Sequence, residues 1–232
     1  MSANAVRVTI FASSTPTTAP PLIAASASFG RLCAEQGLVA VFGGGNAGCM
    51  GAFYDAMIKA GGRVHGITHR MFVKPGGSSL SEENAGDLES LEIVEGSDLS
   101  MRKRRLLDAG DCLVTLPGGV GTFDELFMAI TERGVGCGDL PVLIVNTDGY
   151  YNGAIEQLAR AEREGMLRKR WTDLVDVVDT PEAAVAWCLK QQIRPRKPTP
   201  RAATDYRRGL VHGSVAMIAL MAGVAALARQ RF

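Results

Sequence analysis

Short apolar segments alternate with segments of helical length along most of the chain, and this alternation constrains the fold more than any other feature. The apolar segments cover residues 6–11, 38–42, 63–68, 91–94, 112–116, 141–145 and 176–178. The segments of helical length include residues 22–36, 50–60, 99–109 and 152–164, and a further helix starts with Thr180 as its N-cap and Pro181 at its first position. Apolar strands that alternate with helices are typical of a parallel sheet covered on both faces. The sequence therefore predicts a doubly wound, Rossmann-like α/β fold.

The composition changes near the end of the chain, which divides the sequence into three parts. Residues 1–192 are predicted to form the α/β domain, and the length of 232 residues suits one domain with a sizeable core. A basic, proline-rich linker follows at 193–209, and an apolar tail helix is predicted for 210–232. Residues 210–228 carry His212 as their only ionisable side chain, so this helix is long enough to cross a bilayer. We favour a helix that docks on a partner subunit, with a C-terminal membrane anchor as the alternative.

The charge and the cysteines restrict the partners and the compartment. The formal net charge is +1, which gives no general attraction to nucleic acids or to membranes. The five cysteines are odd in number and lack CxxC spacing, so we expect reduced core thiols in a reducing compartment. The N-terminus has no signal-peptide pattern, and a cytoplasmic location is expected.

Two glycine-rich loops each follow a predicted strand and precede a helix. The first is Gly-Gly-Gly-Asn-Ala-Gly-Cys-Met-Gly at residues 43–51, and its candidate ligand-binding residues are Gly44, Gly45, Gly48 and Met50. Glycines let the backbone approach a ligand, and the N–H groups at the start of the next helix attract an anion. The loop satisfies GxGxxG, but residues 56–81 contain no Asp or Glu to hold a ribose, which disfavours a dinucleotide. A tight turn that binds nothing is the alternative for this loop alone.

The second loop is Pro-Gly-Gly-Val-Gly-Thr-Phe-Asp-Glu at residues 117–125. Its candidate substrate-binding residues are Pro117, Gly118, Gly119, Gly121 and Thr122, and the Thr122 hydroxyl can donate to a phosphate oxygen. Two such loops at the carboxyl ends of strands in one open sheet are expected to face a shared crevice at a topological switch point. Glu125 then lies one turn from a phosphate, beside the sugar of a bound ligand, although a carboxylate at a helix start also favours the helix dipole.

The basic segment Arg-Lys-Arg-Arg at 102–105 lies in a helix for which Asp98 is the expected N-cap. At about 100° per residue, Leu99 and Leu106 mark the buried stripe, and Arg102 and Lys103 flank it. Arg104 and Arg105 point further outward and are expected to be solvated. Arg102 is therefore the candidate cation of the site, and Lys103 a candidate ligand-binding residue.

Other chemistry is disfavoured by the motifs. The SxxK match at residues 100–103 lacks the partner motifs of serine acyl-transfer enzymes, and GxSxG and HExxH do not occur. His65 and His69 are four residues apart but surround a strand end, so no metal site is predicted. The lysines have no recognisable pyridoxal-phosphate context, which disfavours an amino-acid decarboxylase.

Residues 6–192 resemble the LOG ("lonely guy") family of cytokinin-activating phosphoribohydrolases, which was often mislabelled as lysine decarboxylase. The chain matches its PGGxGTxxE motif at 117–125, its GGGxxGxMG motif at 43–51 and its Asp-Gly-Tyr-Tyr stretch at 148–151. The resemblance implies hydrolysis of an N6-modified AMP to a free base and ribose 5-phosphate, with Arg102 and Glu125 as the catalytic pair and no cofactor. It also implies that Ser13 and Ser14 lie near the nucleotide and that the protein is a homodimer or a higher homo-oligomer.

The sequence departs from the family pattern at two places, which bear on the base. Ser100 stands where the family's D-M-H-x-R-K motif has histidine, and His69 stands where its G-V-I-P stretch has proline. The catalytic pair is intact, and an adjacent Arg102 is expected to favour the ionised form of Glu125. Two alternatives remain, namely a general AMP or nucleotide phosphoribohydrolase and a non-catalytic nucleotide-sensing module.

Overall fold

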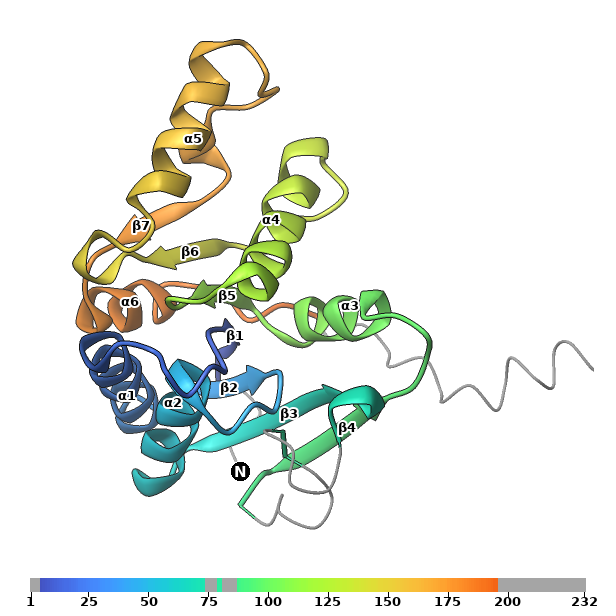
Figure 1. Cartoon of the computed structure of the whole chain (residues 1–232), viewed down its shortest axis with the longest axis vertical. Helices are drawn as coiled ribbons and strands as arrows, with labels where there is room; N and C mark the ends of the chain where they lie inside the picture. Colours follow the sequence, from blue (N-terminus) through green and yellow to red (C-terminus); the bar gives the residue numbers. More distant parts are fainter. Residues whose placement is uncertain (1–4, 74–78, 81–86, 196–232) are drawn as a thin grey trace, which may run out of the picture. The chain divides into compact units, whose positions relative to one another are not determined.

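A parallel sheet of seven strands forms the centre of the part of the chain that the structure describes (Figure 1). The computed structural model describes residues 5–73, 79–80 and 87–195, which lie in one compact unit, Met1–Arg196. The strands are ordered β4-β3-β2-β1-β5-β6-β7, and every adjacent pair is parallel. Their bounds are β1 Arg7–Phe11, β2 Val39–Phe42, β3 Arg63–His69, β4 Ser90–Val94, β5 Cys112–Thr115, β6 Val142–Val145 and β7 Asp176–Val178.

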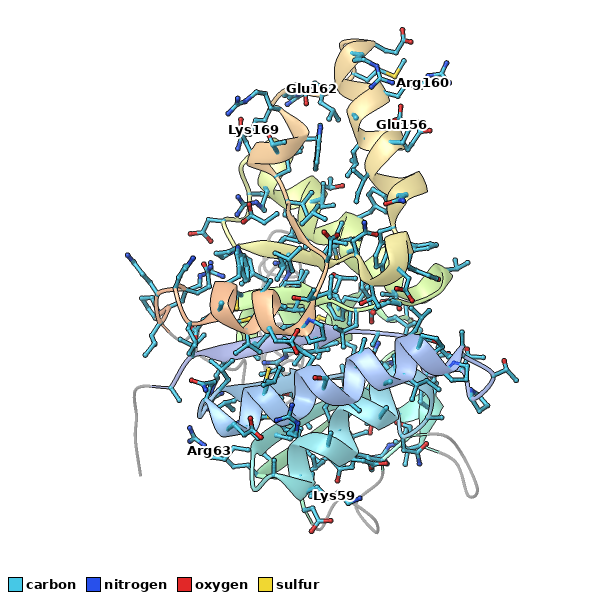
Figure 2. All side chains as sticks on the ribbon, turned by 90° about the vertical axis from the view of Figure 1, so that its left-hand side faces the viewer. Lys59, Arg63, Glu156, Arg160, Glu162 and Lys169 are labelled. Carbon is cyan, nitrogen blue, oxygen red and sulfur yellow. The ribbon has the colours of Figure 1, made fainter. Side chains whose placement is uncertain are left out.

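Helices cover both faces of this sheet. The helices are α1 Pro20–Glu35, α2 Gly48–Lys59, α3 Ser100–Ala109, α4 Val120–Val135, α5 Asn152–Arg163 and α6 Pro181–Cys188. Short 3-10 turns lie at η1 Arg70–Phe72, η2 Thr147–Gly149 and η3 Trp171–Asp173. Figure 2 looks onto the face covered by α1, α2 and α6, whereas α3, α4 and α5 pack on the opposite face.

Each face has its own hydrophobic core, which explains why the central strands are apolar throughout. Phe29 of α1 and Phe53 of α2 pack with Ile10 on one face, and Leu106 of α3 and Leu126 of α4 pack in the core of the other. Every residue of β2, β5 and β6 is buried, whereas the edge strands β4 and β7 are more exposed. The predicted doubly wound α/β fold is confirmed.

The helix caps and the cysteines can be compared with the predictions residue by residue. Thr180 caps α6 as predicted, and its hydroxyl accepts a hydrogen bond from the Ala183 N–H at 3.2 Å. The cap predicted at Asp98 is one residue too early: α3 begins after Leu99, and the Asp98 carboxylate accepts from the Ser100 N–H at 2.7 Å. Four cysteines are buried core thiols as expected, but Cys137 is exposed, because it follows the exposed C-cap glycine of α4.

The predicted linker and tail lie almost wholly outside the described residues. Arg194, at the start of the linker, still contacts the domain, because its N–H donates to the Asp111 carboxylate at 2.7 Å. The apolar tail at 210–232 lies outside the described residues. Among the helices that the structure describes, none is long and apolar enough to cross a membrane.

Candidate active site

The loops after β1, β2 and β5 meet at the carboxyl edge of the sheet. The chain runs from β1 outward through β2, β3 and β4, and then returns to the other side of β1 as β5, which makes this point a topological switch. Ser13 of the β1 loop joins the three, since its N–H donates to the Pro117 carbonyl at 3.0 Å and its carbonyl accepts from the Met50 N–H at 2.9 Å. The predicted shared crevice is therefore confirmed, and it holds a pocket of about 300 Å³.

The start of α4 forms one wall of this pocket. Gly119 is the N-cap, and Val120, Gly121 and Thr122 follow it in the first turn. The N–H groups of a first helical turn have no partner within the helix, so they present donors to an anion. A Cβ atom at Gly118 would lie 2.1 Å from the Thr122 hydroxyl oxygen, so only glycine fits at this place in the loop. The wall is suited to a phosphate group.

The glycines of the β2 loop make room for other parts of the site. A Cβ atom at Gly43 would lie 2.0 Å from the Nη2 atom of Arg102, so a side chain here would displace the arginine. Gly48 has a φ of +59°, a conformation that L side chains rarely adopt, and begins α2 against the carbonyls of Ser13 and Thr15. The glycines of this loop therefore leave room for Arg102 and for the β1 loop, so the loop is more than a tight turn.

Arg102 and Glu125 form a buried ion pair in the pocket. Nη1 of Arg102 donates to Oε1 of Glu125 at 3.1 Å, and the two side chains are only 9% and 11% exposed. The same guanidinium donates to the carbonyls of Ile67 at the end of β3 and of Gly43 after β2, both at 3.3 Å. Arg102 thus joins β3, the β2 loop and α4, and it holds the carboxylate of Glu125 in one place.

Burial has a larger effect on the pKa of Glu125 than the adjacent arginine has. Loss of solvent raises the pKa of the Glu125 carboxyl above its ordinary value, and the Arg102 guanidinium offsets only part of that rise. The predicted effect of the arginine is confirmed, because Arg102 lowers the pKa of this carboxyl, but burial outweighs it and the net pKa is raised. A carboxylate with a raised pKa is a stronger base, which suits it to accept a proton from water.

A second ion pair lies at the edge of the pocket. Nζ of Lys103 donates to both carboxylate oxygens of Asp124, at 3.0 and 2.9 Å, and Asp124 is more exposed than Glu125. Lys103 is the one lysine among the described residues that line the pocket, and this pairing occupies its ammonium group. Its environment is that of a charged rim residue.

The structure brings most of the predicted site residues together. The pocket is lined by the predicted residues Ser13, Ser14, Gly45, Met50, Arg102, Lys103, Gly119, Gly121, Thr122 and Glu125. Four other predicted residues do not line the pocket but belong to the loops that form it: Gly44, Gly48, Pro117 and Gly118. The carbonyls of Gly44, Pro117 and Gly118 accept hydrogen bonds from Leu80, Ser13 and Tyr150, respectively, so these residues fix the loops.

Sequence reasoning missed several residues of the pocket. These are Ala12, Thr15, Gly43, Phe72, Ser79, Leu99, Val120 and Asp124. Phe72 and Ser79 come from the glycine- and serine-rich stretch at 69–90. The Ser79 hydroxyl approaches the Thr68 hydroxyl at 3.0 Å and donates to the Gly44 carbonyl at 3.2 Å. A long loop in a compact domain was a signal of function, but it could not single out these two side chains.

The two arginines that were expected to be solvated are ion-paired instead. Arg104 pairs with Glu132 of α4, and Arg105 pairs with Glu92 of β4 at 3.4 Å. The Arg105 side chain is only 14% exposed. Among the described residues, no group of three or more His, Cys, Asp and Glu side chains could hold a metal ion.

Comparison with known proteins agrees with the motifs. Residues 50–188 match the family described as "Possible lysine decarboxylase". The chain is 30% identical to a bifunctional cytokinin biosynthesis protein of Fusarium pseudograminearum over 80% of this chain and 40% of that protein. It is also 30% identical to a cytokinin riboside 5′-monophosphate phosphoribohydrolase of Mycobacterium tuberculosis, over 78% of this chain and 92% of that one.

The solved structures show the same fold at lower identity. The molybdenum cofactor carrier protein of Chlamydomonas reinhardtii is 19% identical, with a TM-score of 0.57 over 81% of this chain and 99% of that chain. Three of the curated relatives are longer, since the match covers only 40%, 63% and 53% of their lengths. The matched family covers more than half of the chain, and the matched residues include the 117–125 loop that lines the pocket. The chain therefore belongs to the LOG family.

Proposed function

We propose that this protein hydrolyses the N-glycosidic bond of a purine nucleoside 5′-monophosphate with a modified N6 position, releasing the free base and ribose 5-phosphate. The observation that carries the proposal is the buried pair of Arg102 and Glu125, one turn from the first N–H groups of α4. A phosphate on those N–H groups places the sugar beside the Glu125 carboxylate. The curated relative from Mycobacterium tuberculosis bears the name of this activity.

The chemistry follows from this placement. Cleavage of the bond between C1′ and N9 passes through an oxocarbenium-like state, which the negative charge of Glu125 stabilises. The bonding electron pair leaves with the purine, the oxygen of a water molecule forms the new bond to C1′, and the proton lost by that water ends on the released base. Arg102 holds Glu125 in place and compensates part of its buried charge. Contacts to the phosphate position the reacting bond from a distance.

The base is the part of the substrate that the motifs leave open. Two residues of the family pattern are replaced close to the pocket. Ser100 lies between the pocket residues Leu99 and Arg102, and His69 precedes the turn that carries Phe72. A general AMP or nucleotide phosphoribohydrolase is therefore the second candidate. A nucleotide-sensing module would need the phosphate site but not the buried Glu125, which favours the enzyme.

We also propose a cytoplasmic homodimer or higher homo-oligomer. The outer face of α4 carries a groove lined in part by Val120, Phe123, Phe127 and Met128, and Val120 is 83% exposed. Val120 and Asp124 line both this groove and the pocket, so a second copy on this face would lie next to the site. Sedimentation that gives only the monomer mass at micromolar protein would contradict this assembly.

The substitution Glu125→Gln tests the mechanism. It keeps the size of the side chain but removes the charge and the base, so we expect release of the base to fall by at least about 100-fold. Nucleotide binding should stay largely intact, because the phosphate contacts lie in another part of the pocket. Chromatography of the released base measures the first quantity, and calorimetry measures the second.

The matched control is Glu92→Gln. Glu92 of β4 also pairs with an arginine, Arg105 of α3, but it lines neither the pocket nor the groove. This variant should keep most of its turnover. If Glu125→Gln turns over as fast as Glu92→Gln, the assigned role of Glu125 is wrong.

A further inference from the structure

Phe72 is an aromatic side chain whose role the catalytic pair does not explain. It lies at the end of η1, which follows β3, and its ring is 39% exposed although it lines the pocket. We propose that Phe72 is the surface on which the purine base stacks, and that it thereby determines which bases the pocket accepts. This inference rests on the proposed function, because it assigns the base subsite of the same pocket.

The order of the strands places Phe72 away from the phosphate wall. Along the carboxyl edge of the sheet the order is β3, β2, β1 and β5, so η1 after β3 and α4 after β5 lie on opposite sides of the pocket. The pair of Arg102 and Glu125 spans the distance between them, since Arg102 contacts the β3 carbonyl of Ile67 and Glu125 belongs to α4. A nucleotide with its phosphate at α4 and its sugar at Glu125 must therefore direct its base toward Phe72.

The contact with Arg102 fixes how the ring lies relative to the reacting centre. The guanidinium carbon of Arg102 lies 5.5 Å from the centre of the Phe72 ring, within the range of a cation–π contact. The edges of that guanidinium are occupied by Glu125, Ile67 and Gly43. The guanidinium therefore lies over one face of the Phe72 ring and keeps the ring next to the carboxylate of Glu125.

The turn that carries Phe72 is fixed by His69, the residue that replaces the proline of the family pattern. Nδ1 of His69 accepts a hydrogen bond from the Met71 N–H at 3.2 Å, and thereby caps η1. The His69 ring is buried and packs edge-on against Phe72, with centroids 6.5 Å apart. Because the histidine is held inside the protein, the phenyl ring is presented at a defined position and is not a freely moving surface side chain.

The other apolar side chains around the pocket are less suited to a base. Met50 is only 6% exposed, and its sulfur accepts from the Gly45 N–H at 3.1 Å. Val120 belongs to the first turn of α4, at the phosphate wall. Phe72 is the one aromatic residue among the described lining residues, and Leu99 is the apolar neighbour that a substituent on the base could contact. A planar purine with an apolar N6 group fits this chemistry.

Binding to four proteins tests the inference, and Glu125→Gln serves as the parent so that the ligand is not cleaved. Added to this parent, Phe72→Ala should weaken the binding of N6-isopentenyl-AMP and of AMP by about tenfold or more, the scale of a lost base–aromatic stack. It should leave the affinity for ribose 5-phosphate, which has no base, unchanged. Phe72→Trp should restore nucleotide binding. Met71→Ala is the matched control, because Met71 is exposed on the same turn but does not line the pocket.

The outcomes separate this inference from the proposed function. Equal weakening of ribose 5-phosphate and nucleotides would overturn the base platform, because Phe72 would then act on the whole site through Arg102. An unchanged nucleotide affinity in Phe72→Ala, or the same loss in Met71→Ala, would overturn it as well. Base release by the wild-type chain is measured separately, so a protein that shows the Phe72 effect but releases no base contradicts the proposed function alone.

Discussion

At the scale of single residues, two opposing effects meet at Glu125. Burial disfavours its charged form, and the adjacent Arg102 favours it, with burial the larger of the two. Such a pair is costly to break from one side, because a buried charge then loses its partner. The arginine is therefore both a support for the geometry and the main influence that keeps the pKa of Glu125 from rising further.

This balance predicts how the titration of Glu125 responds to substitution. Arg102→Met removes the cation that lowers the pKa of this carboxyl, so the pKa should rise above its already raised value. Arg102→Lys keeps the charge and should leave the pKa nearer to that of the wild type. Titration of the side-chain carboxyl by carbon-detected NMR, assigned by its loss in Glu125→Gln, measures all three proteins.

The direction of the shift decides the outcome. The ionised form of Glu125 predominates above its pKa, so the acidic limit of activity should lie above the ordinary range of a glutamate. An Arg102→Met protein whose Glu125 titrates at or below the wild-type pH would show that the arginine does not stabilise the carboxylate.

The sequence predicted the pair of Arg102 and Glu125 and the glycine-rich loops of the pocket, but not Phe72 and Ser79. Helical periodicity placed Arg102 near the sheet because Leu106 of the same helix had to be buried, and both side chains are buried. Phe72 and Ser79 could not be predicted, because they lie on an irregular segment without periodicity. Tertiary contacts bring these two side chains to the pocket, Ser79 through Thr68 and Phe72 through Arg102 among others.

At the scale of elements, two tyrosines form hydrogen bonds with the loop that leads into α4. The Tyr150 hydroxyl donates to the Gly118 carbonyl at 2.7 Å, and the Tyr151 hydroxyl donates to the Leu116 carbonyl at 2.8 Å. Both tyrosines follow β6, the strand next to β5. Because these carbonyls accept hydrogen bonds from the tyrosines, the loop between Leu116 and α4 is fixed. This contact gives the Asp-Gly-Tyr-Tyr stretch a physical role.

Tyr150→Phe should therefore weaken the grip on phosphate. Loss of the Tyr150 hydroxyl should raise the KM for the monophosphate about 3- to 10-fold, because the loop loses one hydrogen bond. The effect on thermal stability should be small, because Tyr150 is 42% exposed. Tyr151→Phe leaves a buried carbonyl without this partner and should also destabilise the fold, by about 1–3 kcal/mol. Steady-state kinetics and thermal melts measure both effects. A Tyr150→Phe enzyme with an unchanged KM would show that the loop does not need this brace.

The element boundaries were predicted where a local signal exists. Thr180 and Pro181 marked the start of α6 correctly, because the cap is a contact between residues close in sequence. The start of α3 was placed one residue too early, since the Asp98 side chain bonds to Ser100 whether or not Asp98 is the cap. Side-chain partners such as Glu132 for Arg104 come from another helix and leave no trace in local sequence.

At the scale of the whole molecule, the reversal of strand order creates the site. The loops after β1, β2 and β5 become neighbours only because the chain returns to the centre of the sheet after β4. The sequence predicted this arrangement from two glycine-rich loops, since loops at the carboxyl ends of parallel strands in one open sheet share one edge. What it could not predict is the groove on α4 beside the pocket, because Val120 and Phe127 follow no pattern that separates an interface from a solvated helix.

The measurement that tests the account most directly is release of the base by the wild-type protein. N6-isopentenyl-AMP, AMP and the N6-isopentenyl riboside without phosphate would each be incubated with the protein and separated by chromatography. We predict release of isopentenyladenine from the monophosphate and none from the riboside, because the N–H groups at the start of α4 have no phosphate to hold in the riboside. Faster release from AMP would keep the chemistry and change the base. No release from either monophosphate, while both bind, would contradict the account and indicate a nucleotide-sensing protein.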